Sequence, residues 1–197
     1  MKRYAAALLL PISFLAHAQP EAGKDYLPID PPLQIHEKKI ELIEFFYYGC
    51  PECLDLEPFL NNWLQGRRDI RVVRIPAFRS SWLPLARTYY ALSILGQEDR
   101  LRSRIFQAMH QGIDLNSEEV LFGWIGSQGV DAEKFKSVYH SKLVRSRIME
   151  SEDLARKLGI SGVPSLVVDG KFLVLGNLAD EDRLDELIDM AKKMQRK

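Results

Sequence analysis

The sequence predicts an α/β domain that is interrupted by a block of helices. Runs rich in β-branched and aromatic residues occur at 39–47, 70–75, 165–168 and 171–175. Apolar residues recur at helical spacing between these runs and after the last one. Over about 79–147 only the helical pattern is present, so we expect these helices to form a single insertion.

The start of the chain has the pattern of an export signal. Two basic residues precede an apolar stretch at 5–15, and a small-x-small pattern at 16–18 predicts cleavage before Gln19. The apolar stretch is too short for a membrane anchor, which needs about 20 residues. We therefore expect a signal peptide over 1–18 and a mature, exported domain over 19–197.

The composition is that of an ordinary globular protein, with 46% hydrophobic and 27% charged residues. The formal net charge is zero, and it becomes −2 when Lys2 and Arg3 leave with the signal peptide. This balance indicates no nucleic-acid partner. Export would place the cysteines in a compartment where disulfides persist.

Residues 19–32 predict an extended arm rich in turn formers, and Leu33–His36 predicts a short edge strand. The run from Lys39 to Tyr47 is apolar on both faces, which is typical of a central strand covered on both sides. Glu44 is its exception. A carboxylate buried there should have a raised pKa, and we expect it to relay protons to Cys53. The alternative is that the sheet ends early and Glu44 is solvated.

The next feature is Cys50-Pro51-Glu52-Cys53, which contains the only two cysteines of the chain. A helical pattern begins directly after Gly49, so Cys50 should lie at a helix N-terminus, where the dipole favours a thiolate and lowers its pKa. Pro51 suits the first helical turn because its missing N–H needs no partner there. The spacing places both sulfurs on one helical face, which indicates a redox pair.

Two other interpretations of the cysteines are weaker. A zinc site needs about four ligands, and the candidates His36, His110 and His140 are scattered. A purely structural disulfide that closes so small a loop would remove little chain entropy.

The remaining elements follow in order. Residues 70–75 predict a second strand, and 81–147 predict a series of helices whose arginines at 100, 102 and 104 read as a solvated face. Asp169-Gly170 lies between two β-rich runs, which is a strong hairpin signal. An amphipathic helix over 180–194 ends the domain.

This order resembles the thioredoxin fold with a helical insertion and, more narrowly, the DsbA family of periplasmic thiol:disulfide interchange proteins. The resemblance spans essentially the whole mature chain. It is carried by Glu44-Phe45-Phe46, the Cys50-Pro51-Glu52-Cys53 motif, Gly162-Val163-Pro164 and Val168-Asp169-Gly170-Lys171.

The resemblance implies roles for particular residues. Cys50 would be the nucleophile and Cys53 the resolving cysteine. Pro164 would be a cis-proline facing them, Val163 would offer backbone hydrogen bonds to an extended substrate, and Pro51 would line the same binding site.

It also implies the activity and its partners: a monomeric, periplasmic dithiol oxidase that needs no metal or organic cofactor. Its substrates would be reduced, unfolded exported proteins, and a DsbB-like membrane quinone reductase would reoxidise it. The alternatives are a disulfide reductase or isomerase, and a non-catalytic peptide-binding or chaperone module.

The chain is compared with the family pattern at two positions. Glu52 stands where the family often has His, and a carboxylate two residues from Cys50 should disfavour the thiolate. The family also often has a basic partner for the buried acid on the next strand, and Arg74 is the candidate for that partner of Glu44. Both positions bear on the redox poise more than on the reaction.

Overall fold

The computed structural model describes residues 19–35, 37–77 and 79–195, so the predicted signal peptide lies outside the described residues. One mixed sheet has the strand order β1-β5-β4-β2-β3. Its strands are β1 (Tyr26–Pro28), β2 (Ile40–Phe46), β3 (Ile70–Pro76), β4 (Ser165–Val168) and β5 (Phe172–Val174). The parallel β2–β3 pair is joined by a helix, and the other neighbouring strands are antiparallel.

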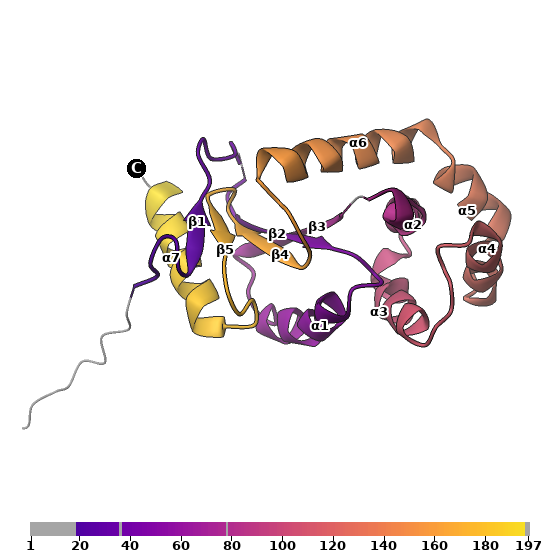
Figure 1. The fold of residues 1–197 in the computed structure, drawn as a ribbon, viewed down its shortest axis with the longest axis horizontal. Coiled ribbons are helices and arrows are strands. Elements are labelled where there is room, and N and C mark those ends of the chain that lie inside the picture. The colour runs from indigo at the N-terminus through magenta and orange to yellow at the C-terminus, as the bar shows by residue number, and fades with distance from the viewer. Residues whose placement is uncertain (1–18, 36, 78, 196–197) are drawn as a thin grey trace, which may run out of the picture.

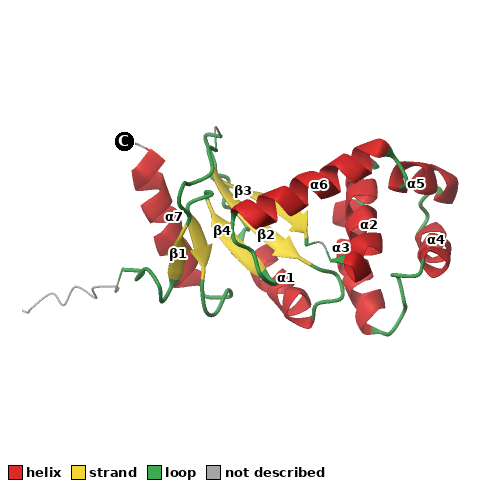
Figure 2. Ribbon diagram, turned by 45° about the horizontal axis from the view of Figure 1, so that its top comes forward, coloured by secondary structure: helices red, strands yellow, loops and turns green. Residues whose placement is uncertain are grey.

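Helices pack on the sheet, and further helices extend the domain at one end (Figures 1 and 2). Those on the sheet are α1 (Pro51–Trp63), α6 (Lys142–Lys157) and α7 (Glu181–Gln195). The others are α2 (Leu83–Ile94), α3 (Glu98–His110), α4 (Glu118–Ser127) and α5 (Ala132–Tyr139), preceded by a short 3-10 turn at Ser80–Trp82. Helices α2 to α6 all lie between β3 and β4 in the chain, and α6 continues past the end of the insertion expected over about 79–147.

Strand β2 is central and buried on both faces, which confirms the strand predicted over 39–47. Ile40 and Leu42 pack on the side of α1 and α7, whereas Ile43 and Phe45 pack on the side of α6. Figure 1 shows the corresponding layers, with α6 on one side of the sheet and α1 on the other. Because side chains alternate along a strand, this pattern needs apolar residues at both parities.

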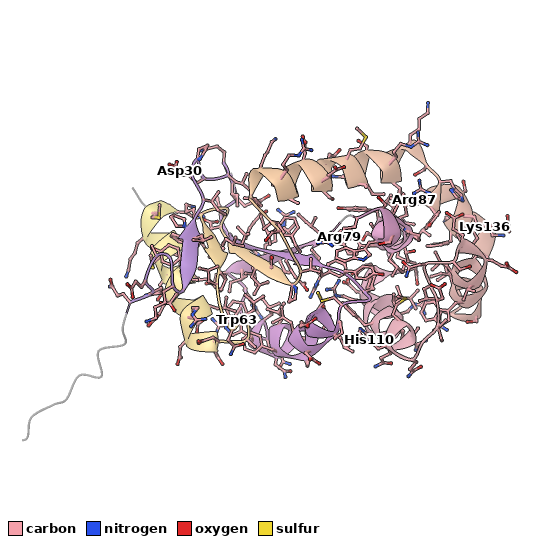
Figure 3. The ribbon with its side chains drawn as sticks, in the orientation of Figure 1. Asp30, Trp63, Arg79, Arg87, His110 and Lys136 are labelled. Atoms are coloured by element: carbon pink, nitrogen blue, oxygen red, sulfur yellow. The ribbon has the colours of Figure 1, made fainter. Side chains whose placement is uncertain are left out.

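Side-chain contacts join the helices that share a face of the sheet, and Figure 3 labels Trp63 of α1 among them. Trp63 of α1 donates its indole N–H to Asp185 of α7 at 3.2 Å, which joins the two helices on one face of the sheet. The insertion has its own apolar core, including Leu101, Ile105 and Phe135, and this core continues to Phe46 and to both cysteines. The insertion is therefore packed directly against the end of β2 that precedes the cysteine motif.

The predicted hairpin is present between β4 and β5. Asp169 and Gly170 both have positive φ angles, 51° and 62°, which is the left-handed conformation that a two-residue turn between antiparallel strands requires. Asp131 caps α5 by accepting a hydrogen bond from the backbone N–H of Lys134.

The prediction of an edge strand over Leu33–His36 is wrong for its described part. The edge strand is instead β1, within the expected extended arm, where Tyr26 pairs with Val174. Leu33 makes a single backbone bond to Gly170. The two prolines before it, Pro31 and Pro32, have no N–H to donate to a ladder.

Within the part of the chain that the structure describes, no helix combines the length and the apolar character that crossing a membrane requires.

Candidate active site

The two cysteines lie at the start of α1, as the sequence predicts. Cys50 is the N-cap residue with an extended backbone, and Pro51 occupies the first helical turn. Both cysteines are free thiols, and they differ in burial: Cys50 is 8% exposed and Cys53 is 0% exposed. Cys50 is therefore more covered than a helix N-terminus alone implies, because Val163 and the insertion core pack around it.

Cys50 contacts two groups that the sequence had singled out. Its Sγ lies 3.3 Å from Oε2 of Glu52, and the thiol donates a hydrogen bond to this carboxylate. The same Sγ lies 3.5 Å from the carbonyl oxygen of Val163. The bond between Val163 and Pro164 is cis, as expected. The loop before β4 therefore lies against the first sulfur of the pair.

Burial raises the pKa of the Cys50 thiol, and the Glu52 carboxylate raises it further. Hydrogen bonding from the Cys53 thiol and backbone N–H offsets part of this rise. The backbone N–H at the helix N-terminus lowers this pKa, as expected, but burial outweighs it, so the expected net lowering is wrong for the reduced protein. Glu52 raises the pKa of Cys50, as expected, and it does so through direct contact with the sulfur. In turn, backbone and thiol hydrogen bonds lower the pKa of Glu52.

Cys53 is in a different environment. Burial raises its pKa far above the ordinary thiol range, and hydrogen bonding with Cys50 and the charge of Glu44 add to the rise. A thiolate formed at Cys53 would therefore need a proton quickly. Glu44 is the acidic residue whose charge acts on Cys53, so it is the candidate proton donor.

Glu44 is fully buried, so the alternative of a solvated Glu44 is wrong. It pairs in register with Arg74 of β3, and Nε of Arg74 lies 3.1 Å from its Oε2. Arg74 is thus the basic partner on the next strand. Burial raises the pKa of Glu44, whereas Arg102 and Arg74 lower it and Glu57 raises it.

Sequence reasoning missed most of this charged cluster. Arg102 was assigned with Arg100 and Arg104 to a solvated face. Those two are exposed, but Arg102 is only 4% exposed. Nη2 of Arg102 lies 3.2 Å from both oxygens of Glu44. One available signal was its position on α3, directly after the fully buried Leu101.

Arg102 also binds two further buried carboxylates. It donates to Glu57 through Nε at 2.8 Å, and Nη1 lies 3.4 Å from Oε1 of Glu98. Glu98 in turn accepts a hydrogen bond from the Tyr48 hydroxyl at 3.2 Å. Glu57 was recognisable from its place one turn after Cys53, among the apolar positions of α1.

A cavity of about 420 Å³ lies beside the motif on the side of α7. Glu52, Asp55 and Leu56 of α1 line it together with Pro164 and the loop at 176–179. Among the described residues, no group of three or more His, Cys, Asp or Glu side chains is placed to hold a metal ion.

The comparisons with known proteins agree with this geometry. The DSBA-like thioredoxin domain model matches residues 74–189. The thiol:disulfide interchange protein DsbA of Burkholderia cepacia is 36% identical over 183 residues, which cover 87% of this chain and 86% of that protein. DsbA of Pseudomonas syringae is 32% identical over 193 residues, covering 93% and 90%.

Solved structures show the same fold. The crystal structure of DsbA from Xylella fastidiosa matches with a TM-score of 0.83 at 27% identity, covering 89% of this chain and 100% of that one. DsbA from Pseudomonas aeruginosa matches with a TM-score of 0.83 at 30% identity, covering 90% and 97%. The predicted thioredoxin-like fold with a helical insertion is thereby confirmed, and the chain belongs to the DsbA family of thiol:disulfide interchange proteins.

Proposed function

We propose that this protein is an exported dithiol oxidase that introduces disulfide bonds into folding proteins through Cys50 and Cys53. The observation that carries the proposal is the contact of Cys50 with the loop of the cis-proline. The Cys50 thiol lies 3.5 Å from the Val163 carbonyl oxygen, next to a cavity that Pro164 lines. A substrate segment in that cavity would bring its own sulfur to Cys50 and not to the enclosed Cys53.

The reaction proceeds in two exchanges. A substrate thiolate attacks Sγ of Cys50 in the oxidised protein, the Cys50–Cys53 bond breaks, and its electron pair goes to Cys53. Cys53 takes a proton from Glu44. The second substrate thiolate then attacks the substrate sulfur of the mixed disulfide and Cys50 leaves. Cys50 leaves as a thiolate and takes a proton from solvent, and Glu44 regains its proton from solvent, which has received the two protons of the substrate thiols. The substrate has lost two electrons, and the cysteine pair has gained them.

The residues around the cavity support binding of an extended, unfolded segment. Pro164, Leu56 and Leu178 provide apolar surface, and the backbone of Val163 lies beside the sulfur. Pro51 is exposed in the first turn of α1, directly before Glu52 of this cavity. Such a site contacts backbone and small apolar groups, so it accepts many sequences.

The family and the predicted leader support the proposed compartment and partners. Residues 1–18 are removed on export, the mature protein works in the periplasm, and its substrates are reduced, unfolded exported proteins. A DsbB-like membrane quinone reductase restores the disulfide, since each cycle leaves the protein as a dithiol.

The direct test is to mix the oxidised protein with a reduced, unfolded protein and to count the thiols that remain. We expect stoichiometric loss of substrate thiols, and no loss with Cys50→Ser. A peptide-binding or chaperone module would instead keep its activity in the Cys50→Ser variant, which would contradict the proposal.

A reductase or isomerase is the second candidate, favoured by the Glu52–Cys50 contact. A carboxylate beside Cys50 disfavours the thiolate and so makes the disulfide a weaker oxidant. Equilibration with a glutathione buffer separates the two, because an oxidase is found mostly as the dithiol under conditions in which a reductase is mostly the disulfide.

A further inference from the structure

Arg102 occupies an unusual position for an arginine. It comes from α3 of the helical insertion, yet its guanidinium is buried and contacts carboxylates of β2, α1 and α3. It also lies over the Phe46 ring, with Cζ 4.1 Å from the centroid. Such a planar, multidentate group can hold several carboxylates in a defined geometry, which an ammonium cannot do.

The cluster around Arg102 contains more acids than bases. Its carboxylates are Glu44, Glu57 and Glu98, and its cations are Arg74 and Arg102. Oε2 of Glu57 is buried without a hydrogen-bond partner among the described residues. Burial disfavours the full ionisation of such a cluster, and Arg102 contacts both oxygens of Glu44 within it.

The cluster also has its own opening to solvent. A cavity of about 290 Å³ is lined by Arg74 and Glu98, together with Tyr89, Ser93 and the start of α3. None of its residues lines the cavity beside Pro164. This opening is lined by residues of β3, α2 and α3, whereas the cavity beside Pro164 is lined by α1 and by the loops at Pro164 and at 176–179. Protons can therefore reach the cluster while a substrate covers Cys50.

We propose that Arg102 is a positioning residue of the redox reaction, through which the helical insertion holds Glu44 in place to exchange a proton with Cys53. The inference rests on the proposed function, because it needs Glu44 to act on Cys53. When Cys53 leaves the disulfide as a thiolate, the proton moves from the Glu44 carboxyl to Sγ, and Arg102 stabilises the carboxylate that forms. In the reverse step the proton returns to Glu44 as Cys53 attacks.

The groups that set this exchange come from every element around Glu44. They are Arg74 from β3, Arg102 from α3, and Glu57 and Cys53 from α1. Glu98 and Tyr48 act on Arg102 from the other side. Removal of Arg102 takes away a cation that favours ionised Glu44, so the ionisation of Glu44 should move to higher pH.

The test is the pH dependence of the rate at which Cys53 releases glutathione from Cys50. Reduced protein is mixed rapidly with oxidised glutathione, the reaction is quenched with acid, and the species are separated by mass. We expect Arg102→Met to shift the ionisation in this profile upward by about one pKa unit or more. The matched control is Arg100→Met on the same helix, whose side chain is exposed and bonds Gln97, and it should shift nothing.

A merely structural role of Arg102 is separated by the Glu44→Gln background. There Arg102→Met should shift nothing further, since the group that it acts through is gone. An equal shift with and without Glu44 would overturn the inference. Should Arg102→Met not fold, Arg102→Lys gives the same readout with a smaller upward shift, and an unshifted profile for a folded Arg102→Lys then overturns it.

The experiment also distinguishes the two levels of proposal. If Glu44→Gln leaves the profile and the rate unchanged, the role proposed for Glu44 fails and Arg102 loses its target. If Glu44→Gln changes the profile while Arg102→Met does not, only the inference about Arg102 is wrong.

Discussion

The two sulfurs of this protein each lie near a glutamate, and the two glutamates are in opposite environments. Glu52 is exposed and contacts Cys50 directly at 3.3 Å. Glu44 is fully buried, binds two arginines and acts on Cys53 through its charge. The pKa of Glu52 is lowered and that of Glu44 is raised. Glu52 therefore supplies a fixed negative charge beside Cys50, whereas Glu44 carries the proton that we propose it exchanges with Cys53.

The comparison shows that burial decides what a carboxylate does beside a thiol. A solvated carboxylate stays ionised and opposes the thiolate by repulsion, which salt partly screens. A desolvated carboxylate holds its proton to higher pH, so it can give that proton to a thiolate that forms nearby. The following predictions test each side of this contrast.

The largest difference should be in stability. Arg102→Met leaves buried carboxylates without their cation, so it should lower the free energy of unfolding by about 3–5 kcal/mol. Arg100→Met, on the exposed face of the same helix, should change it by no more than about 0.5 kcal/mol. Urea unfolding of both variants measures this, and equal small effects would show that the buried cluster does not depend on Arg102.

The two thiols should differ strongly in reactivity. Cys50 should be alkylated faster than Cys53 in the reduced protein, by about 100-fold or more, because each unit of pKa between two thiols counts tenfold in thiolate. The exposure of the two thiols predicts the same order of reactivity, because only Cys53 is fully enclosed. Timed iodoacetamide labelling with peptide mapping checks this, and comparable rates would contradict the assignment of the two roles.

The buried acid should make stability depend on pH. The pKa of Glu44 is raised in the folded protein, so its stabilising effect is complete below about 4.5, its ordinary value, and is lost as the pH rises through the folded value. The stability of the wild type relative to Glu44→Gln should therefore fall with rising pH, with a limiting slope of about 1.4 kcal/mol per pH unit. A difference that stays constant with pH would mean that Glu44 does not titrate above its ordinary range.

The smallest expected effect is on the exposed side. Glu52→His removes the carboxylate beside Cys50 and should lower the pKa of the Cys50 thiol by about one unit. The protein should become more oxidising by about 30 mV, the value of a tenfold change for two electrons. Thiolate absorbance titrated against pH measures the first change and glutathione equilibration the second. Asp55→His, one residue before Leu56 on the same rim, is the control, and an equal change there would assign the effect to general charge.

The redox motif and its surroundings could be predicted because their signals are local. Cys50 and Cys53 are three residues apart on one helix, and the strand before them is apolar at both parities. Glu44 was identified as buried from its place in that strand alone. The turn at Asp169-Gly170 likewise depends on the conformational preferences of two adjacent residues.

The charged cluster could not be predicted because its members meet only in the folded chain. Arg102 lies 58 residues from Glu44 and 45 from Glu57. Arg100, Arg102 and Arg104 occur at every second position of one helix, so the residue type alone does not tell which of them is buried. The same limit affected the pKa of Cys50, since position at a helix N-terminus predicts a lowered value and only the packing around the thiol shows the burial that outweighs it.

Patterns along one strand or one helix are enough to predict the α/β class, the redox pair and the acid in the preceding strand, and the resemblance carried by four motifs predicts disulfide exchange. The tertiary structure decided how that acid is held, which arginine of three is buried, and how far each sulfur is enclosed. The physical reason is that desolvation and charge pairing depend on every group within a few ångströms, and in this chain those groups come from β2, β3, α1 and α3.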